Sequence, residues 1–196
     1  MCKVYPSDCT REQFEWLVSR LPADKPFGRP RTTSLWAILN AIFYVLCEGC
    51  TWWGLPGDFP PWQTVYTYFR RWKKDGTLLA IHDELYVLSR LVEGRSDSPS
   101  ALIVDSQSVK TATMIAEAVG YDGAKKTKGR KRHLSIDTLG FILRVLVTAA
   151  AVPEREGGQR VLKKVKQMGQ TVRRVHTVRV DGGYDGAPFY QWAIDT

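Results

Sequence analysis

Two aspartates stand at the ends of apolar stretches in the second half of the chain. Asp105 directly follows Ala101–Val104, a run that predicts a strand buried on both faces. Asp181 ends a second predicted strand, residues 175–181. A buried, ionised carboxylate costs several kcal/mol unless a cation or hydrogen bonds compensate. If the two strands are neighbours, both carboxylates can reach one divalent cation, which would remove that cost.

Paired carboxylates of this kind suit Mg²⁺, or Mn²⁺ in its place, because Mg²⁺ takes one or two carboxylates together with water and phosphate oxygens. Two such ions activate the attacking oxygen and stabilise the leaving oxygen in phosphodiester chemistry. Gly182 and Gly183 follow Asp181 directly, and glycines let a backbone approach metal or phosphate closely. A plain turn from a strand into a helix explains these glycines equally well.

A strongly basic run lies between the two aspartates. Six of the eight residues from 125 to 132 are cationic, which is typical of a solvated loop or of a phosphate-binding strip. Its position beside the carboxylates favours contact with DNA. The candidates are Lys125, Lys126, Lys128, Arg130, Lys131 and Arg132. Lys110 is either another phosphate contact or an exposed loop lysine.

Composition points to the same kind of partner. The 196-residue chain has a formal net charge of +8 and a pI of about 9.4, which favours nucleic acid over a membrane surface. The longest apolar stretch, residues 35–47, is too short to span a bilayer. The first residues lack the apolar core of a signal peptide, so we expect a cytoplasmic protein that does not enter a membrane.

The first 93 residues read as a helical domain. Thr10 and Gln13 have the spacing of a capping box, and further helices are predicted over residues 35–47, from about 62 to 75, and over 78–92. The third helix carries Arg70, Arg71, Lys73 and Lys74 near its end. These cations either favour the helix dipole and solvate one face, or they mark the DNA-contacting helix of a helix-turn-helix-like domain.

Residues 94–100 are rich in Gly, Ser and Pro and predict a linker. After it, strands are expected at 101–105, 133–137, 141–149 and 175–181, with a type I turn at 137–140 and a basic helix at 157–168. Glu154 and Glu156 stand where this helix begins, where anions are favoured. Asp185 is a candidate N-cap for a last helix, and His133 and His176 are expected to be structural.

At this point the residues resemble a known family, the DDE transposases of bacterial insertion sequences, in the insertion-sequence-five group. The similarity covers nearly the whole chain. Residues 49–56 and 59–66 resemble the group's helical N-terminal domain, Val104–Lys110 and Lys128–His133 its first catalytic block, and Val180–Tyr184 its second. The resemblance implies an α+β or α/β chain, with residues 1–93 helical and helix-turn-helix-like, and residues 101–196 an incomplete RNase H-like domain with a mixed sheet.

The resemblance also implies metal-dependent cleavage and strand transfer of double-stranded DNA at transposon terminal inverted repeats and target sites. It assigns Asp105 and Asp181 as the first two carboxylates of the triad. The third belongs to a Tyr-x2-Arg-x3-Glu-x6-Lys pattern, and nothing after Asp181 matches it. Glu154 and Glu156 precede Asp181 and stand in the wrong order. We therefore expect a truncated or frame-split form with weak or no catalysis alone and a less stable C-terminal half.

Two other functions are compatible with the sequence. One is a non-catalytic DNA-binding regulator derived from a transposase, which would compete with a full enzyme for the terminal repeats. The other is an RNase H-like nuclease or resolvase, which would prefer branched DNA. A homo-oligomer is a further candidate assembly that the sequence does not decide.

Overall fold

A computed structural model describes residues 4–23, 31–111, 119–184 and 186–195. The chain divides into two compact units, residues 1–82 and 83–196. The division falls inside helix α4 (Thr77–Val92), whereas the sequence analysis placed it between residues 93 and 101. Ile81 of α4 packs in the core of the first unit, and Tyr86 of α4 packs in the core of the second.

The first unit is helical, as predicted. It contains α1 (Arg11–Val18), α2 (Leu35–Glu48), the short 3-10 helix η1 (Trp52–Gly54), α3 (Trp62–Lys74) and the start of α4. The capping box at α1 is confirmed, because Thr10 Oγ1 accepts a hydrogen bond from Gln13 N and Gln13 Oε1 accepts one from Thr10 N. Helix α2 supplies most of the buried core, around Ile38, Leu39 and Ile42.

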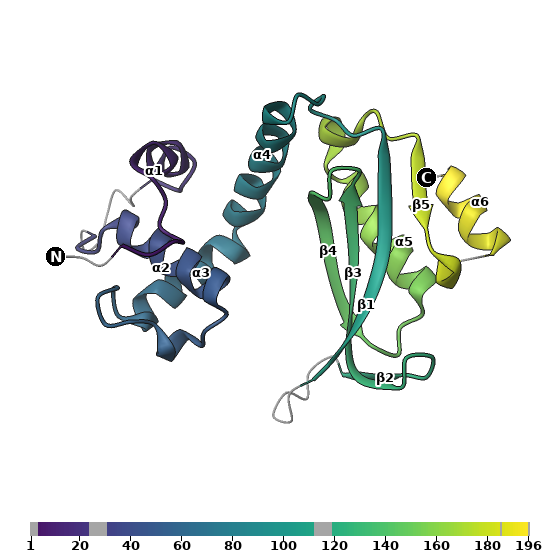
Figure 1. Ribbon diagram of the computed structural model, residues 1–196, viewed down its shortest axis with the longest axis horizontal. Helices are drawn as coiled ribbons and strands as arrows, with labels where there is room; N and C mark the ends of the chain where they lie inside the picture. Colours follow the sequence, from purple (N-terminus) through teal and green to yellow (C-terminus); the bar gives the residue numbers. More distant parts are fainter. Residues whose placement is uncertain (1–3, 24–30, 112–118, 185, 196) are drawn as a thin grey trace. The chain divides into compact units, whose positions relative to one another are not determined.

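The second unit is a mixed sheet with helices. Its elements after α4 are β1 (Ala101–Lys110), β2 (Gly120–Asp122), β3 (Thr127–Asp137), β4 (Ile142–Ala149), α5 (Glu154–Lys166), η2 (Gly169–Val172), β5 (Thr177–Val180), η3 (Gly182–Tyr184) and α6 (Ala187–Asp195). Strand β1 is central, antiparallel to β3 and parallel to β5. Strand β4 pairs with β3 on its other side, and β2 pairs with the beginning of β3. The chain is therefore an α+β protein (Figure 1).

Two strands are longer than the sequence predicted. Strand β3 begins at Thr127 rather than at His133, and β1 continues to Lys110 rather than ending at Asp105. The two strands pair over nine residues, from Leu102 opposite Asp137 to Lys110 opposite Gly129. Lys125 and Lys126 lie in a turn, as a loop would have them, but from Thr127 onward pairing with β2 and β1 draws the basic run into the sheet.

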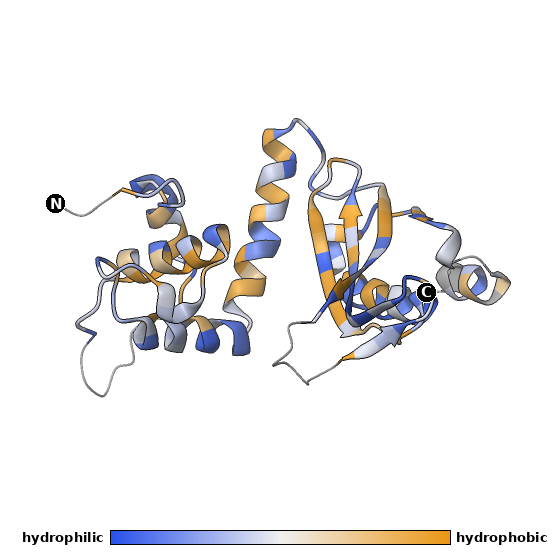
Figure 2. Cartoon of the chain, turned by 60° about the horizontal axis from the view of Figure 1, so that its bottom comes forward, coloured by the Kyte–Doolittle hydropathy of each residue, from blue (hydrophilic) through white to orange (hydrophobic). Residues whose placement is uncertain are grey.

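Helix α5 lies on one face of the sheet (Figure 1), and the core of this unit lies between them. Leu102 and Val104 of β1 are almost completely buried, together with Val161 and Val165 of α5. The first turn of α5 contains Glu154 and Glu156, as the sequence predicted. Figure 2 shows hydrophobic stretches along the strands and an alternation of hydrophobic and hydrophilic stretches along α4. None of the described helices combines the length and the apolar character needed to cross a bilayer.

Polar side chains attach the second half of α4 to the sheet. Asp137, which is completely buried, accepts hydrogen bonds from Tyr86 (3.1 Å) and from the guanidinium of Arg90. Arg144 of β4 forms a two-point ion pair with Asp83, at 2.5 and 2.7 Å. The remaining oxygen of Asp137 accepts the backbone N–H groups of the following turn. Removing one partner of such a buried pair is strongly destabilising.

Helix α5 can approach the sheet closely because it carries a glycine opposite a histidine. His133 of β3 is completely buried and its Nε2 lies 3.1 Å from Thr148 Oγ1. A Cβ atom added to Gly157 would overlap the His133 ring. Glycine is thus required here by the short distance between helix and strand.

We predict that Gly157→Ala lowers the free energy of unfolding by about 1–3 kcal/mol, because overpacking forces a helix or side-chain shift that outweighs the better helix propensity of alanine. Urea unfolding followed by circular dichroism measures the change. Gly123→Ala is the matched control, since a Cβ there meets nothing within 4 Å. Equal stability of the two variants would show that α5 does not need the glycine.

His133 also predicts a pH dependence of stability. Burial, and then the charge of Lys131, lower the pKa of His133 below its ordinary value of 6.5. The folded state therefore favours the neutral ring, so this contribution to stability is complete above pH 6.5 and is lost as the pH falls through the lowered pKa. Unfolding free energies measured from about one unit above to about one and a half units below the ordinary value should fall less steeply with falling pH for His133→Gln. His176→Gln, at an exposed position, should keep the wild-type slope.

Candidate active site

The register of the two parallel strands brings the two aspartates together. Val104 of β1 pairs with Val180 of β5, so Asp105 is the next residue along β1 and Asp181 directly follows the end of β5. Residues paired in register point to the same face of a sheet. The condition set by the sequence analysis, that the two aspartate-bearing strands be neighbours, is met.

Asp105 is not buried, contrary to the expectation from its apolar strand. Strand β1 alternates: Leu102 and Val104 are buried against α5, whereas Asp105 and Gln107 are exposed on the opposite face. The carboxylate therefore stays hydrated and carries no large burial cost. Among the described residues it accepts no hydrogen bond, while Asp181 Oδ1 accepts one from Gly183 N at 3.1 Å.

These two carboxylates fit a divalent cation. Both are exposed oxygen donors, Asp105 in the middle of β1 and Asp181 directly after β5, and Mg²⁺ is bound through one or two carboxylates with water and phosphate completing its shell. In the part of the chain that the structure describes, no three His, Cys, Asp or Glu side chains are close enough to hold a metal together.

A third carboxylate lies close to this pair. Glu154, at the start of α5, accepts hydrogen bonds through Oε1 from Ser106 Oγ (2.8 Å) and Lys125 Nζ (3.1 Å). Burial raises the pKa of Glu154, but these two hydrogen bonds outweigh it and hold the pKa below its ordinary value. From the sequence alone, Glu154 is expected at the beginning of a helix, without these contacts.

A buried tyrosine lies near enough to all three carboxylates to feel their charges. Tyr184 is completely enclosed, and its hydroxyl lies near Ser106 without a hydrogen bond of normal geometry among the described residues. Burial raises the pKa of Tyr184, and the charges of Glu154, Asp105 and Asp181 raise it further. The tyrosine thus remains a neutral donor beneath the site.

Along β3, the side chains of the basic run alternate between the two faces of the sheet. Lys128 and Arg132 are exposed and Arg130 is half-buried, and their positions share the face of Asp105, since Asp105 pairs with Leu134 and Gln107 with Arg132. Arg132 donates a hydrogen bond to Gln107 Oε1 at 3.1 Å. The open face of the sheet therefore carries both the carboxylate and cations.

Lys131 points to the other face and is only 4% exposed. Its ammonium lies 3.1 Å from Asp122 Oδ2 and also donates to Val152 O. A hydrogen bond from Ser108, together with Lys131, holds the pKa of Asp122 well below its usual range. Lys131, which the sequence analysis counted among the DNA-binding residues, is thus engaged inside the fold.

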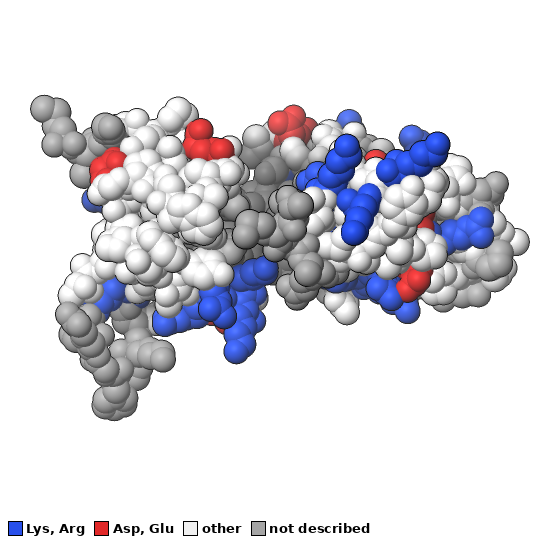
Figure 3. Space-filling model, turned by 90° about the horizontal axis from the view of Figure 1, so that it is seen from below, with Lys and Arg blue, Asp and Glu red and all other residues white. Residues whose placement is uncertain are grey.

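Most of the other cations that the sequence suggested for DNA binding are exposed. Lys110, Lys125 and Lys126 are exposed, although Lys125 is held by Glu154. In the first unit Arg70, Arg71, Lys73 and Lys74 are exposed on α3, on either side of the buried Trp72. The space-filling view in Figure 3 shows Lys and Arg side chains on each of the two units. Asp185, the candidate N-cap, lies outside the described residues.

Arg179 is a candidate that the sequence analysis missed. It is exposed on β5, pairs in register with Ile103, and stands two positions before Asp181. Residues two apart in a strand share a face, so this signal was available from the predicted strand. Glu154 lies beside Gly183 because of the way α5 packs on the sheet. No pattern in the sequence predicts that packing.

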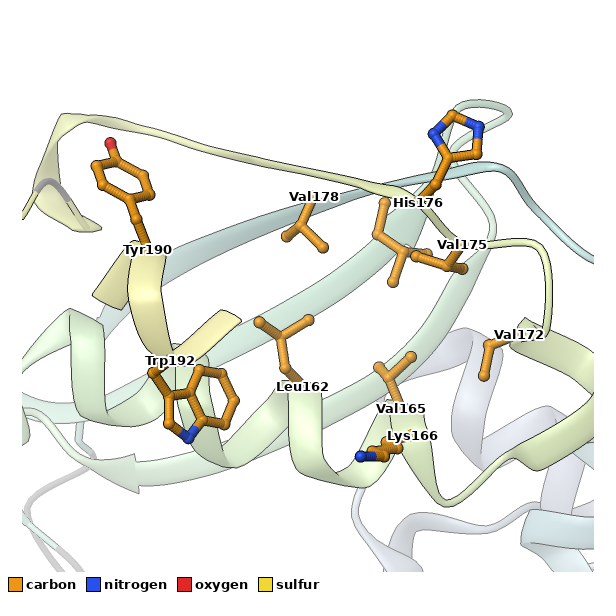
Figure 4. A pocket seen from close by; sticks show the side chains of 10 residues that line it. Leu162, Val165, Lys166, Val172, Val175, His176, Val178, Tyr190 and Trp192 are labelled. Atoms are coloured by element: carbon orange, nitrogen blue, oxygen red, sulfur yellow. The ribbon is translucent and has the colours of Figure 1, made fainter. Parts of the chain in front are cut away.

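A separate hollow of about 630 Å³ lies between β5, α5 and α6 (Figure 4). Leu162 and Val165 of α5, Val178 of β5, and Tyr190 and Trp192 of α6 contribute to its lining. No aspartate or glutamate is among the described residues that line it. This apolar hollow is therefore no part of the carboxylate site.

Comparison with known proteins agrees with the arrangement. Residues 9–82 match the family model described as "Putative transposase of IS4/5 family (DUF4096)", and residues 96–196 match the model described as "Transposase DDE domain". No curated protein and no solved structure matches. The second match alone covers more than half of the chain, and with the first it shows that the chain belongs to the DDE transposases of the IS4/5 type.

Proposed function

We propose that this chain binds DNA at the ends of an insertion sequence and presents Asp105 and Asp181 as the metal-binding pair for strand cleavage and transfer. The observation that carries the proposal is the register of β1 and β5, which makes the two carboxylates neighbours on an open, basic face. A divalent cation held there would activate the attacking oxygen and stabilise the leaving oxygen of a phosphodiester. This function places the protein in the cytoplasm, with DNA as its partner.

The residues of the open face support a contact with the phosphate backbone. Lys128 and Arg132 are exposed on the same side of the sheet as Asp105, and Arg179 stands on the strand that leads to Asp181. Arginine and lysine neutralise phosphates without reading sequence. In the first unit, the exposed Arg70, Arg71, Lys73 and Lys74 of α3 remain our candidates for a second contact.

The same 196 residues contain no match to the Tyr-x2-Arg-x3-Glu-x6-Lys pattern. We therefore propose that they bind metal and DNA but cleave weakly or not at all by themselves. A non-catalytic regulator built from a transposase would behave in the same way in binding assays. Cleavage separates the two interpretations.

We predict that Asp105→Asn and Asp181→Asn each weaken Mn²⁺ binding at least about tenfold, since each removes one of two carboxylate ligands. Electron paramagnetic resonance of free Mn²⁺ during a titration measures this affinity. Glu156→Gln is the control, because this exposed carboxylate pairs with Arg160. Wild-type affinity in both aspartate variants would refute the proposed metal site.

The same proteins should be tested for Mg²⁺-dependent nicking of a plasmid that carries the gene with its flanking DNA. We expect little nicking by the wild-type chain. Robust nicking that is lost in Asp105→Asn would confirm the transposase chemistry and overturn the expectation of weak activity.

We further predict that the double variant Lys128→Ala/Arg132→Ala reduces the salt dependence of DNA binding by about two units of slope, one for each phosphate that the variant no longer neutralises. Fluorescence anisotropy with a duplex at several salt concentrations gives the slope. Lys164→Ala is the matched control, since this exposed lysine lies on α5, over the opposite face of the sheet. An unchanged slope in the double variant would mean that this face is merely solvated.

A further inference from the structure

We propose that Glu154 is a positioning residue of the carboxylate site, where it ties the part of β1 that carries Asp105 to the turn that carries Asp181. The inference rests on the proposed function, because it takes the two aspartates as the metal-binding pair. Glu154 lies on a third element, at the first turn of α5, and so can hold two strands in a fixed relation.

The first contact of Glu154 is with the residue that follows Asp105. Ser106 is only 7% exposed, and its hydroxyl donates to Glu154 Oε1 at 2.8 Å. Ser106 points to the α5 face while Asp105 points to the open face, since neighbouring residues alternate in a strand. Fixing Ser106 from one side therefore fixes the orientation of Asp105 on the other.

The second contact is with the turn after β5. A Cβ atom added to Gly183 would overlap Glu154 Oε2 and would lie 3.3 Å from Asp181 Oδ1. The two carboxylates thus border the same small space, which only a glycine leaves open. Gly183 N also donates to Asp181 Oδ1 at 3.1 Å, so the position of Gly183 against Glu154 orients the aspartate.

Lys125 completes the arrangement and explains how the extra charge is tolerated. Its ammonium lies 3.1 Å from Glu154 Oε1 and also donates to Ser106 O at 3.1 Å. Three acidic side chains close together repel one another, and this cation offsets the charge of Glu154. Oε1 is thus engaged by Ser106 and Lys125, whereas Oε2 is the oxygen that borders Gly183.

Glu156 provides a comparison within the same helix turn. Both glutamates are at the N-terminus of α5, where the helix dipole favours them equally. Glu156 is exposed and pairs with Arg160, four residues further along α5. Among the described contacts, Glu154 reaches Ser106 of β1 and Gly183, whereas Glu156 reaches Arg160. A general effect of the helix N-terminus would therefore be shared by both residues, and a positioning effect would not.

The test compares Glu154→Ala, Glu154→Gln and Glu156→Ala in the 196-residue chain. We expect Glu154→Ala to weaken Mn²⁺ binding about tenfold, the usual effect of losing a group that orients metal ligands. Glu154→Gln keeps an acceptor for Ser106 and the same side-chain length, and should bind Mn²⁺ almost as well as wild type. Glu156→Ala should leave the affinity unchanged.

A second measurement uses the metal-free protein. Hydrogen exchange of the Gly183 and Tyr184 amides, which donate to Asp181 Oδ1 and Asp181 O, should be faster in Glu154→Ala and restored in Glu154→Gln. If Glu154→Ala does not fold, Ser106→Ala replaces it, because it removes the same hydrogen bond and should weaken Mn²⁺ binding in the same direction.

Each outcome either supports or overturns the positioning role of Glu154. Wild-type Mn²⁺ affinity in Glu154→Ala, or in Ser106→Ala where that variant is used, overturns the positioning role. A loss in Glu154→Gln as large as that in Asp105→Asn makes Glu154 a ligand and overturns it as well. A wild-type chain that binds no Mn²⁺ refutes the proposed metal site itself. If instead Asp105→Asn weakens Mn²⁺ binding and Glu154→Ala does not, the metal site stands and only the positioning role is refuted.

Discussion

The parallel pairing of β1 with β5 is the constraint on which the candidate site depends. Val104 opposite Val180 brings the segments that carry Asp105 and Asp181 side by side, with each aspartate directly after one member of the pair. A slip of one residue in either strand would move one carboxylate to the face that α5 covers. Leu102 and Val104 resist such a slip, because they are buried beneath α5 and would have to exchange places with the exposed Asp105.

Local signals in the sequence predicted several helices of the chain well. The Thr10 and Gln13 capping box, the apolar helix α2 and the acidic first turn of α5 all appear as expected. Each of these signals lies within one element, where neighbours in sequence are also neighbours in space. The order of strands and helices likewise predicted a mixed fold with a sheet in its second half.

The basic run shows where local reasoning fails. Six cations in eight residues suggested a solvated loop or a phosphate-binding strip, with contact to DNA favoured, but from Thr127 onward the run is a strand, and a strand sends alternate residues to opposite faces. Lys131 is consequently buried against Asp122 while Arg132 is exposed beside Gln107. Charge density alone does not distinguish these neighbours, because the partner of Lys131 comes from a separate strand. The role of Glu154 could not be predicted for the same reason, because its contacts come from β1 and from the turn after β5.

The aspartates of the second unit differ in how their oxygens are satisfied, and this difference explains Asp105. Asp137 and Asp122 are buried, and each is surrounded by cations, hydroxyl groups and backbone N–H donors. Asp105 is exposed and accepts no hydrogen bond from the described residues. A carboxylate that only supported the fold would gain from such donors, and the fold provides them elsewhere. The open oxygens of Asp105 on a basic face agree with its proposed role as a ligand for a divalent cation.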